Sequence, residues 1–392
     1  MPTFIKSFRP SGILSFCPDI EPISLLPLNV LIGPNGSGKS NFVEILELLR
    51  AAPSDLAAAV RDGGGVSEWL WKGTRENSLG RLEATVSLPG FPTDFRYRLE
   101  FGVAGSRLEV LDEAIEDALV TRHGAPDVRF YYRFQRGHPV MSVQRGGQPR
   151  RLNRESLDPQ QSVLSQRKDP DLYPEVTALG KAFRGIATFR EWTFGRNPPL
   201  RQPQPADLPG DSLLPDARNL ALFINSIEHS DAWSELKKAL RRFLPRFDQI
   251  STRLIAGTAQ IFLHEKGLST PVPATRLSDG TIRFIALIAI LLKPEFASLI
   301  CIEEPELGMH PDALGLIAEL LRAASAKTQI VVTTHSDILL SALSDSAESV
   351  LVCENVNGTS AVRRLEKEKL GPWLRDYRLG EVWRAGELGG NP

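Results

Sequence analysis

The stretch LNVLIGPNGSGKSN, residues 28–41, decides the fold of this chain. Its first residues, 28–32, are mostly apolar and predict a short buried strand, and residues 42–49 predict the helix that follows. Between them, three glycines precede Lys39 and Ser40. This spacing is typical of a phosphate-binding loop, in which main-chain N–H groups surround a phosphate, the lysine contacts its oxygens and the serine reaches a magnesium ion.

We expect the whole loop to contact a nucleotide. Its residues are Gly33, Pro34, Asn35, Gly36, Ser37, Gly38, Lys39, Ser40 and Asn41. A glycine turn that only joins a strand to a helix is the alternative interpretation, and it accounts for neither the lysine nor the complete spacing. The loop therefore predicts a P-loop nucleotide-binding core.

The composition is that of a soluble globular protein, and 392 residues suffice for one large domain or two ordinary ones. The formal net charge of −1 gives no overall attraction to nucleic acid, so such binding would need a local patch. Three widely spaced cysteines without a CxxC pair argue against disulfides and structural zinc, and we expect a cytoplasmic protein. The longest apolar run, residues 284–292, is about half the length that spans a bilayer, so no membrane span is expected.

Apolar and polar residues alternate over residues 82–88, 95–101 and 128–134, which predicts strands of an antiparallel meander and not crossover units. Farther along, residues 186–194 predict a strand and residues 249–264 a hairpin. Helical spacing is present over residues 173–183, 217–227 and 233–243.

Eight arginines surround the last meander strand. They are Arg122, Arg129, Arg133, Arg136, Arg145, Arg150, Arg151 and Arg154. A solvated strand face is one interpretation, and a surface that follows the phosphates of DNA or RNA is the other. The aromatic residues that alternate with these arginines suit an apolar inner face better than base stacking.

Three further motifs follow in the last third of the chain. LSDGT, residues 277–281, precedes an apolar helix, so Ser278 and Gly280 lie at a helix N-terminus that can hold an anion. A buried strand at 299–302 ends in Glu303 and Glu304, whose side chains point to opposite sides, one toward a metal and the other toward water. Another strand ends in TTHS, which puts His335 at the sheet edge where open α/β sheets bind ligands.

In this order, GPNGSGKSN, LSDGT, LICIEEPE and TTHS resemble the ABC-type ATPases of the RecF, SMC and OLD kind. The resemblance is specific over residues 4–49 and 277–354 and diffuse between them. It implies an ATPase that uses ATP and Mg²⁺. It assigns catalytic roles to three residues: Lys39, Glu304 as the base that orients water, and His335 as the switch that senses the γ-phosphate.

The resemblance also assigns the remaining contacts. Ser278 and Gly280 would be the signature that touches ATP bound to the other protomer, and Ser40 would ligate magnesium. Most relatives have aspartate before the catalytic glutamate, whereas this chain has Glu303, whose longer side chain could hold magnesium through a water molecule. The magnesium-ligating glutamine is not located by spacing, and we prefer Gln166 to Gln161.

The fold that follows is α/β: a P-loop NTPase core of ABC-ATPase type with an antiparallel β-meander lobe and a helical insertion. We expect the core to comprise residues 1–50 and 245–366, the lobe and insertion residues 51–244, and a loose C-terminal tail residues 367–392.

The function that follows is an ATP-dependent homodimer that opens and closes on DNA or on a partner effector protein. Relatives of this kind occur beside effector genes in phage-defence and repair systems, so the effector would be a nuclease or a toxin. OLD-type relatives carry a nuclease domain after the motif TTHS, and this chain is too short there for one, so cleavage is expected of a separate polypeptide.

Two other functions remain open at this point. A regulatory scaffold that binds ATP and hydrolyses it negligibly is suggested by Glu303, and turnover distinguishes it from the first hypothesis. The nucleotide-binding subunit of a membrane transporter is disfavoured, because such subunits usually have a shorter span between phosphate loop and signature and because the meander fits the RecF-like pattern.

Overall fold

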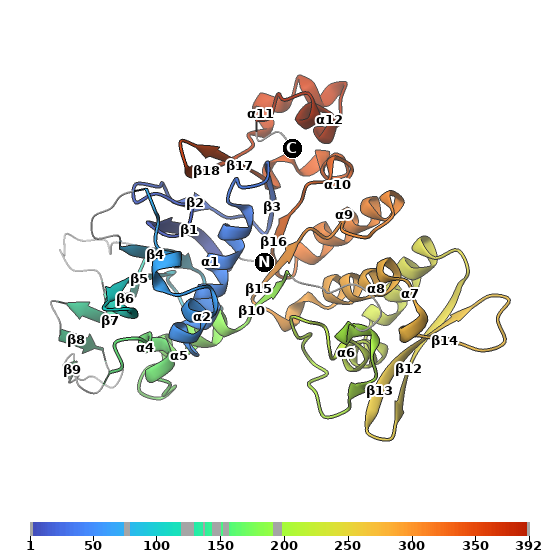
Figure 1. The fold of residues 1–392 in the computed structure, drawn as a ribbon, viewed down its shortest axis with the longest axis horizontal. Coiled ribbons are helices and arrows are strands. Elements are labelled where there is room, and N and C mark those ends of the chain that lie inside the picture. Colours follow the sequence, from blue (N-terminus) through green and yellow to red (C-terminus); the bar gives the residue numbers. More distant parts are fainter. Residues whose placement is uncertain are drawn as a thin grey trace.

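The computed structural model shows a central sheet with an antiparallel lobe on one side and a smaller mixed unit on the other (Figure 1). It describes residues 3–73, 79–118, 129–135, 138–142, 150–151, 157–190 and 198–389.

The central sheet has six strands and carries the phosphate loop. In spatial order they are β10 (Ile186–Phe189), β15 (Leu299–Glu303), β16 (Gln329–Thr333), β3 (Leu28–Ile32), β17 (Val350–Val356) and β18 (Thr359–Arg364). All neighbours are parallel except β17 and β18, so the carboxyl ends of five strands meet at one edge. Parallel strands are covered on both faces, which is why β3 is buried at every residue.

Strand alternation divides the core into two apolar clusters. Val30 and Ile32 face the cluster that contains α8 (Asp279–Leu292) and α9 (Pro311–Ser325), whereas Leu31 faces the cluster that contains α1 (Lys39–Ala51) and the antiparallel lobe. The central sheet therefore lies between the two clusters and couples them.

The predicted meander is confirmed and is part of an eight-stranded antiparallel sheet. Its order is β2 (Ile23–Ser24), β1 (Ile5–Ser11), β4 (Gly80–Val86), β5 (Phe95–Ala104), β6 (Arg107–Asp117), β7 (Phe130–Gln135), β8 (His138–Met141) and β9 (Arg150–Arg151). The N-terminal strand β1, expected in the nucleotide-binding core, pairs with β4 instead. Its position between two distant segments has no local sequence signal.

Two other segments also differ from the expected division of the chain. Strand β10, expected with the lobe, pairs with β15 and forms an edge of the central sheet. The hairpin of β12 (Phe247–Ile255) and β13 (Thr258–Glu265), expected in the core, forms a separate sheet with the short strands β11 (Gln204–Pro205) and β14 (Val272–Pro273). In both cases the strand itself was predictable, but its pairing partner was not.

The remaining helices cover these sheets. They are α2 (Leu56–Asp62), α3 (Val66–Trp69), α4 (Val163–Gln166), α5 (Pro174–Arg184), α6 (Leu220–Glu228), α7 (Ala232–Phe243), α10 (Asp337–Ser341), α11 (Lys367–Leu370) and α12 (Leu379–Arg384). No helix within the described part of the chain is both long and apolar enough to cross a bilayer.

The C-terminal segment is packed, which corrects the expectation of a loose tail over its described part. Leu379 and Trp383 of α12 are completely buried, and the helix packs on α10 (Figure 1). Arg384 pairs with Asp337 at 3.0 Å, and the Leu379 N–H donates to Ser344 Oγ at 2.9 Å. A helix this short shows too few turns for its apolar spacing to be recognised in the sequence.

The carboxyl group of Glu113 on β6 is buried inside the antiparallel lobe. It accepts hydrogen bonds from the Val163 N–H at 2.8 Å, Tyr97 Oη at 2.9 Å and Ser162 Oγ. Burial raises the pKa of Glu113 to about 7, although these hydrogen bonds favour the charged form.

The raised pKa of Glu113 predicts that the lobe loses stability as the pH rises. Unfolding returns the carboxyl to its ordinary pKa of 4.5, so between 4.5 and about 7 the unfolded state binds fewer protons and the free energy of unfolding falls. The fall can reach about 3 kcal/mol. Urea unfolding of the parent and of Glu113→Gln across this range should show the parent losing stability relative to the variant. Parallel pH curves would contradict the prediction.

Candidate functional site

The phosphate loop connects β3 to α1 in a conformation that only glycine tolerates at two points. Gly33 has a φ of 150°, and a Cβ there would lie 2.1 Å from the carbonyl oxygen of Cys353. Gly38 has a φ of 98°, and a Cβ there would lie 2.1 Å from Ser360 Oγ. The loop is therefore shaped by positive backbone angles and by close contact with β17 and β18.

Polar groups of the loop are arranged to receive an anion. Lys39 Nζ donates to the carbonyl oxygens of Gly33 at 2.8 Å and Pro34 at 2.9 Å, and burial lowers the pKa of this ammonium group. Ser37 Oγ is buried without a hydrogen-bond partner in the described structure. A phosphate would satisfy this hydroxyl and supply the negative charge that Lys39 lacks within the loop.

The start of α1 is held from outside the loop. Asn41 Nδ2 donates to Ser15 Oγ at 2.8 Å, and Ser360 Oγ donates to the same oxygen at 2.7 Å. Ser40, by contrast, is exposed in the first turn of α1. Of these two loop residues, the structure leaves the Ser40 hydroxyl accessible, whereas Asn41 supports the loop.

Glu304 follows β15 in a strained backbone conformation. Its φ is 45°, a left-handed value that is costly for a residue with a side chain. Hydrogen bonds of its backbone hold it: among them, the Glu304 N–H donates to the carbonyl oxygen of Thr333 at 3.0 Å, and Arg283 Nη2 donates to the Glu304 carbonyl oxygen at 2.7 Å. Strain of this kind is concentrated at functional sites because it aims a side chain in a particular direction.

His335 lies beside Glu304, as the shared sheet edge predicts. Its Nε2 is 3.8 Å from Glu304 Oε1. Burial, together with the nearby charge of Lys39, lowers the pKa of the imidazole and so favours its neutral form. A neutral imidazole can both donate and accept a hydrogen bond near a phosphate oxygen.

Glu306 positions the His335 segment, a role that the sequence analysis missed. Its Oε1 accepts from Thr334 Oγ1 and from the His335 N–H, each at 2.7 Å. Its second oxygen is buried without a hydrogen-bond partner in the described structure. The motif EEPE contained this residue, but only the tertiary structure shows what it contacts.

Glu303, at the last position of β15, pairs with Arg190, which the sequence analysis also missed. Arg190 Nε lies 3.3 Å from Glu303 Oε2, and Arg190 Nη1 donates to Glu47 Oε2 on α1 at 3.0 Å. Glu303 Oε1 is buried and has no hydrogen-bond partner in the described structure. Burial raises the pKa of Glu303, and the guanidinium of Arg190 opposes this shift.

The oxygen donors at this edge fit magnesium. Ser40 offers an accessible hydroxyl, and Glu303 offers the unpaired Oε1. Among the described residues no group of three or more His, Cys, Asp or Glu side chains is arranged to hold a metal. Magnesium commonly takes one or two protein oxygens and completes its shell with water and phosphate, so such a sparse donor set is adequate.

The structure does not bring Gln166 to this edge, and the expectation for it is corrected. Its amide nitrogen donates to the carbonyl oxygens of Asp158 and Gln161, and its Oε1 accepts from the Asp158 N–H. The neighbouring Gln161 bonds Leu56, just beyond the C-terminal end of α1. Because α1 has 13 residues and is about 20 Å long, this region lies at the opposite end of the helix from Ser40.

The signature segment begins α8. Ser278 caps this helix, its Oγ accepting from the Thr281 N–H at 3.1 Å, and within the described chain it makes no hydrogen bond to the phosphate loop. Gly280 packs against Gly308, and a Cβ on Gly280 would lie 2.5 Å from the carbonyl oxygen of Gly308. Asp279 pairs with the buried Arg201. The helix start is therefore fixed in place, with the Ser278 side chain at its tip.

The arginine-rich stretch is only partly described. Arg133 pairs with Glu116 at 2.9 Å and Arg129 with Glu175 at 3.9 Å. Arg150 and Arg151 form β9, of which only the backbone is described. The other four lie outside the described residues: Arg122, Arg136, Arg145 and Arg154. Nucleic-acid binding by this stretch stays a prediction.

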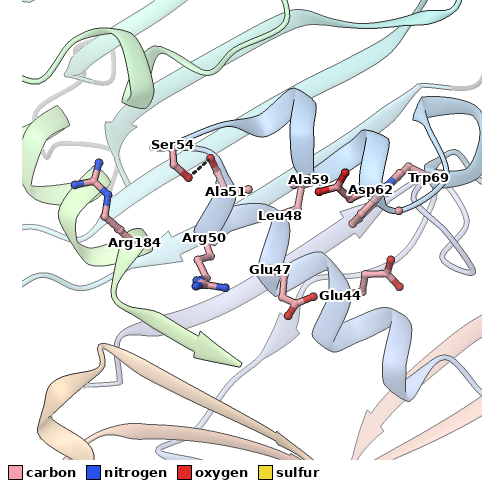
Figure 2. A pocket seen from close by; sticks show the side chains of 11 residues that line it. Glu44, Glu47, Leu48, Arg50, Ala51, Ser54, Ala59, Asp62, Trp69 and Arg184 are labelled. Carbon is pink, nitrogen blue, oxygen red and sulfur yellow. Dashed lines mark hydrogen bonds between the residues drawn. The ribbon is translucent and has the colours of Figure 1, made fainter. Parts of the chain in front are cut away.

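A cavity of about 550 Å³ opens beside α1 and does not include the phosphate loop. Figure 2 shows Glu44, Glu47 and Arg50 along α1, and Arg184 of α5 also belongs to the lining. Glu47 belongs both to this lining and to the pair with Arg190. Arg190 therefore connects a residue of the cavity lining, Glu47, to Glu303.

Comparison with known proteins identifies a family for this chain. A family described as "AAA domain, putative AbiEii toxin, Type IV TA system" matches residues 28–341. The chain belongs to this AAA-domain family. The matched region runs from β3 to α10 and includes the loop, the signature, the carboxylates and His335.

Among curated proteins, the Old nuclease of Escherichia phage P2 is 34% identical to this AAA-family chain over 137 residues. The match spans 32% of this chain and only 22% of that nuclease. A solved SMC head bound to the C-winged helix domain of ScpA matches with a TM-score of 0.59 and 14% identity, covering 93% of this chain and 99% of that one.

A second solved structure, an Smc head domain with an extended coiled coil bound to the C-terminal domain of ScpA from Pyrococcus furiosus, gives a TM-score of 0.57 at 15% identity. It covers 95% of this chain and 99% of that one. At these identities the SMC heads show the fold alone. Together with the family, they confirm the resemblance to ABC-type ATPases of the RecF, SMC and OLD kind, and the protein is an ATPase.

The contacts of Glu306 predict a positioning effect on turnover. Glu306→Ala removes the acceptor that holds the Thr334 hydroxyl and the His335 N–H, so kcat should fall at least tenfold while nucleotide affinity changes little. Glu306→Gln keeps one carbonyl acceptor and should retain most of the activity. Steady-state kinetics and calorimetric nucleotide titration check both variants, and an alanine variant as active as the parent would show that Glu306 does not position His335.

Proposed function

We propose that this ATPase hydrolyses ATP with Mg²⁺ in a dimer that sandwiches the nucleotide, and that hydrolysis drives a conformational change on DNA or on a partner effector protein. The observation that carries the proposal is the meeting of four features at one sheet edge: the phosphate loop, Glu303, the strained Glu304 and His335. Phosphoryl transfer needs little covalent chemistry, so positioned charges and one water-orienting carboxylate suffice.

The chain's own residues divide this work. The loop N–H groups and Lys39 would bind the β- and γ-phosphates, and Ser37 Oγ would gain a partner there. Ser40 and Glu303 Oε1 would hold magnesium, which neutralises the negative charge that develops on the phosphates. Glu304, aimed by its left-handed backbone, would orient the attacking water, and His335 beside it would contact the γ-phosphate.

The signature motif supports a dimer. Ser278 stands at the tip of α8 and makes no bond to the phosphate loop of its own chain within the described residues. We therefore place it against ATP held by a second copy, with the reciprocal contact across a twofold axis. Such an interface is isologous, so both sites form together.

The molecule on which the ATPase would act is proposed by analogy with the names of the family and of the curated relative. The family description mentions a toxin, and the curated relative is a nuclease. We propose that a separate effector of one of these kinds, or DNA, follows the opening and closing of the dimer.

Lys39→Ala should abolish tight ATP binding, because the loop loses the ammonium group that would contact the triphosphate. Isothermal calorimetry measures the loss, which we expect to exceed about 100-fold in Kd. Circular dichroism provides the check on folding. An unchanged affinity for ATP would contradict the assignment of residues 33–41 as a phosphate-binding loop.

Glu304→Gln should bind ATP but hydrolyse it at least about 100-fold more slowly, because the amide cannot accept the proton of water. Phosphate release and nucleotide titration separate the two properties. A variant that turns over at the parental rate would assign the water-orienting role to another residue.

Ser278→Arg tests the trans-acting signature. The long side chain would occupy the place where the partner's γ-phosphate docks, yet it leaves the phosphate loop of its own chain unchanged. In the Glu304→Gln background, ATP should assemble a dimer that light scattering detects, and adding Ser278→Arg should prevent this assembly. Ser278→Ala, which also loses the helix cap but adds no bulk, is the matched control. Assembly of the arginine variant would contradict the sandwich arrangement.

A further inference from the structure

Arg190 occupies a special position at the edge of the central sheet. Phe189 pairs with Ile302 in the parallel register of β10 and β15, so the next residues, Arg190 and Glu303, lie side by side, with Glu303 still paired to Thr333 of β16. Both side chains are largely buried, at 23% and 16% exposure. A guanidinium group thus lies against the carboxylate that precedes Glu304.

The two oxygens of Glu303 have different surroundings. Oε2 lies 3.3 Å from Arg190 Nε, whereas Oε1 is buried without a hydrogen-bond partner in the described structure. Leaving a buried carboxylate oxygen unpaired is costly. One half of this carboxylate is satisfied by an internal cation, and the other half is available to a second cation.

Arg190 is shared between two acids on different elements. Its Nη1 donates to Glu47 Oε2 at 3.0 Å, so the guanidinium bridges β15 and α1, the helix that also carries Lys39 and Ser40. Glu47 is more exposed than Glu303, at 32% against 16%, and it lines the cavity beside α1 (Figure 2). Glu47 is therefore the acid to which Arg190 can shift when the charge near Glu303 changes.

From this arrangement we infer that Arg190 is a positioning residue that serves as the internal counter-cation of Glu303 and competes there with the divalent metal, while Glu47 draws Arg190 away. The inference rests on the proposed function, because it concerns metal loading at Glu303. In this arrangement Glu47 and Glu303 compete for the guanidinium group of Arg190, and this competition sets the affinity of the site for the metal.

The physical basis is repulsion between two cations that share one carboxylate. A metal at Oε1 would lie within a few ångströms of Arg190, where like charges repel even at a high effective dielectric constant. Removing Arg190 should therefore tighten metal binding. Removing the charge of Glu47 should weaken it, because Glu303 is then the remaining ion-pair partner of Arg190 among the described residues, with Glu44 acting only from farther away.

Binding of Mn²⁺, a paramagnetic substitute for Mg²⁺, tests this directly. Electron paramagnetic resonance measures free Mn²⁺ during titration of the full chain saturated with a non-hydrolysable ATP analogue. Arg190→Gln should lower the Kd for Mn²⁺ about three- to tenfold, and Glu47→Gln should raise it by a similar factor. Arg184→Gln is the matched control, since this arginine lines the same cavity but bonds the carbonyl oxygen of Pro53; its Kd should stay parental.

The double variant separates competition from a general field effect. If Glu47 acts through Arg190, then Glu47→Gln should have little effect in the Arg190→Gln background. An equal effect of Glu47→Gln in both backgrounds would overturn the inference, as would an unchanged or raised Kd in Arg190→Gln.

Two measurements keep the outcome interpretable. Thermal unfolding monitors the fold of Arg190→Gln. If that variant does not fold, Glu47→Gln, at a half-exposed position, decides the question through the direction in which it changes the Kd for Mn²⁺. An unchanged or lowered Kd would overturn the inference. A parent that binds the analogue equally with and without Mn²⁺ would contradict the proposed function itself. A parent that needs Mn²⁺, with variants identical to it, would contradict only the role of Arg190.

Discussion

The parallel pairing of β15, β16 and β3 is the constraint on which the whole site depends. Thr333 stands beside both Glu303 and Leu31 in register, so the loops that follow these three strands leave the sheet at one edge. The phosphate loop, the carboxylates and His335 come from distant parts of the chain, and the register of the sheet brings them to one edge. A shift of one residue in β16 would move every one of these contacts and would also turn its apolar side chains to the other core cluster.

The strained backbone of Glu304 connects this edge to the signature helix. Arg283, on α8, donates to the Glu304 carbonyl oxygen, while the Thr333 carbonyl oxygen accepts the Glu304 N–H. A left-handed conformation at such a residue costs on the order of 1–3 kcal/mol, and these hydrogen bonds offset it. Since Ser278 caps α8, one helix connects the signature to the residue that would orient water.

Electrostatics at the edge is balanced by pairs that the chain itself provides. Lys39 is held by loop carbonyl oxygens, Arg190 by Glu303 and Glu47, and Glu306 by the His335 segment. Yet Ser37 Oγ and one oxygen of each of Glu303 and Glu306 are buried without hydrogen-bond partners among the described residues. Buried polar groups normally have partners, so these unsatisfied atoms mark where ligand charge and hydrogen bonds belong.

The sequence by itself determined the local chemistry: the phosphate loop, the paired carboxylates and the strand tips were recognisable because consecutive residues specify a loop conformation and a strand end. The antiparallel meander was predictable for the same reason, since alternation is a local property. Only the tertiary structure decided the pairings between distant residues, such as Arg190 with Glu303 and Glu306 with His335. It also shows that Gln166 lies at the far end of α1 and that α12 packs on α10. Strands β1 and β10 belong to other sheets than the sequence predicted. These features depend on register between segments that are remote in the chain, and short helices or single strands carry no signal of the partner against which they pack.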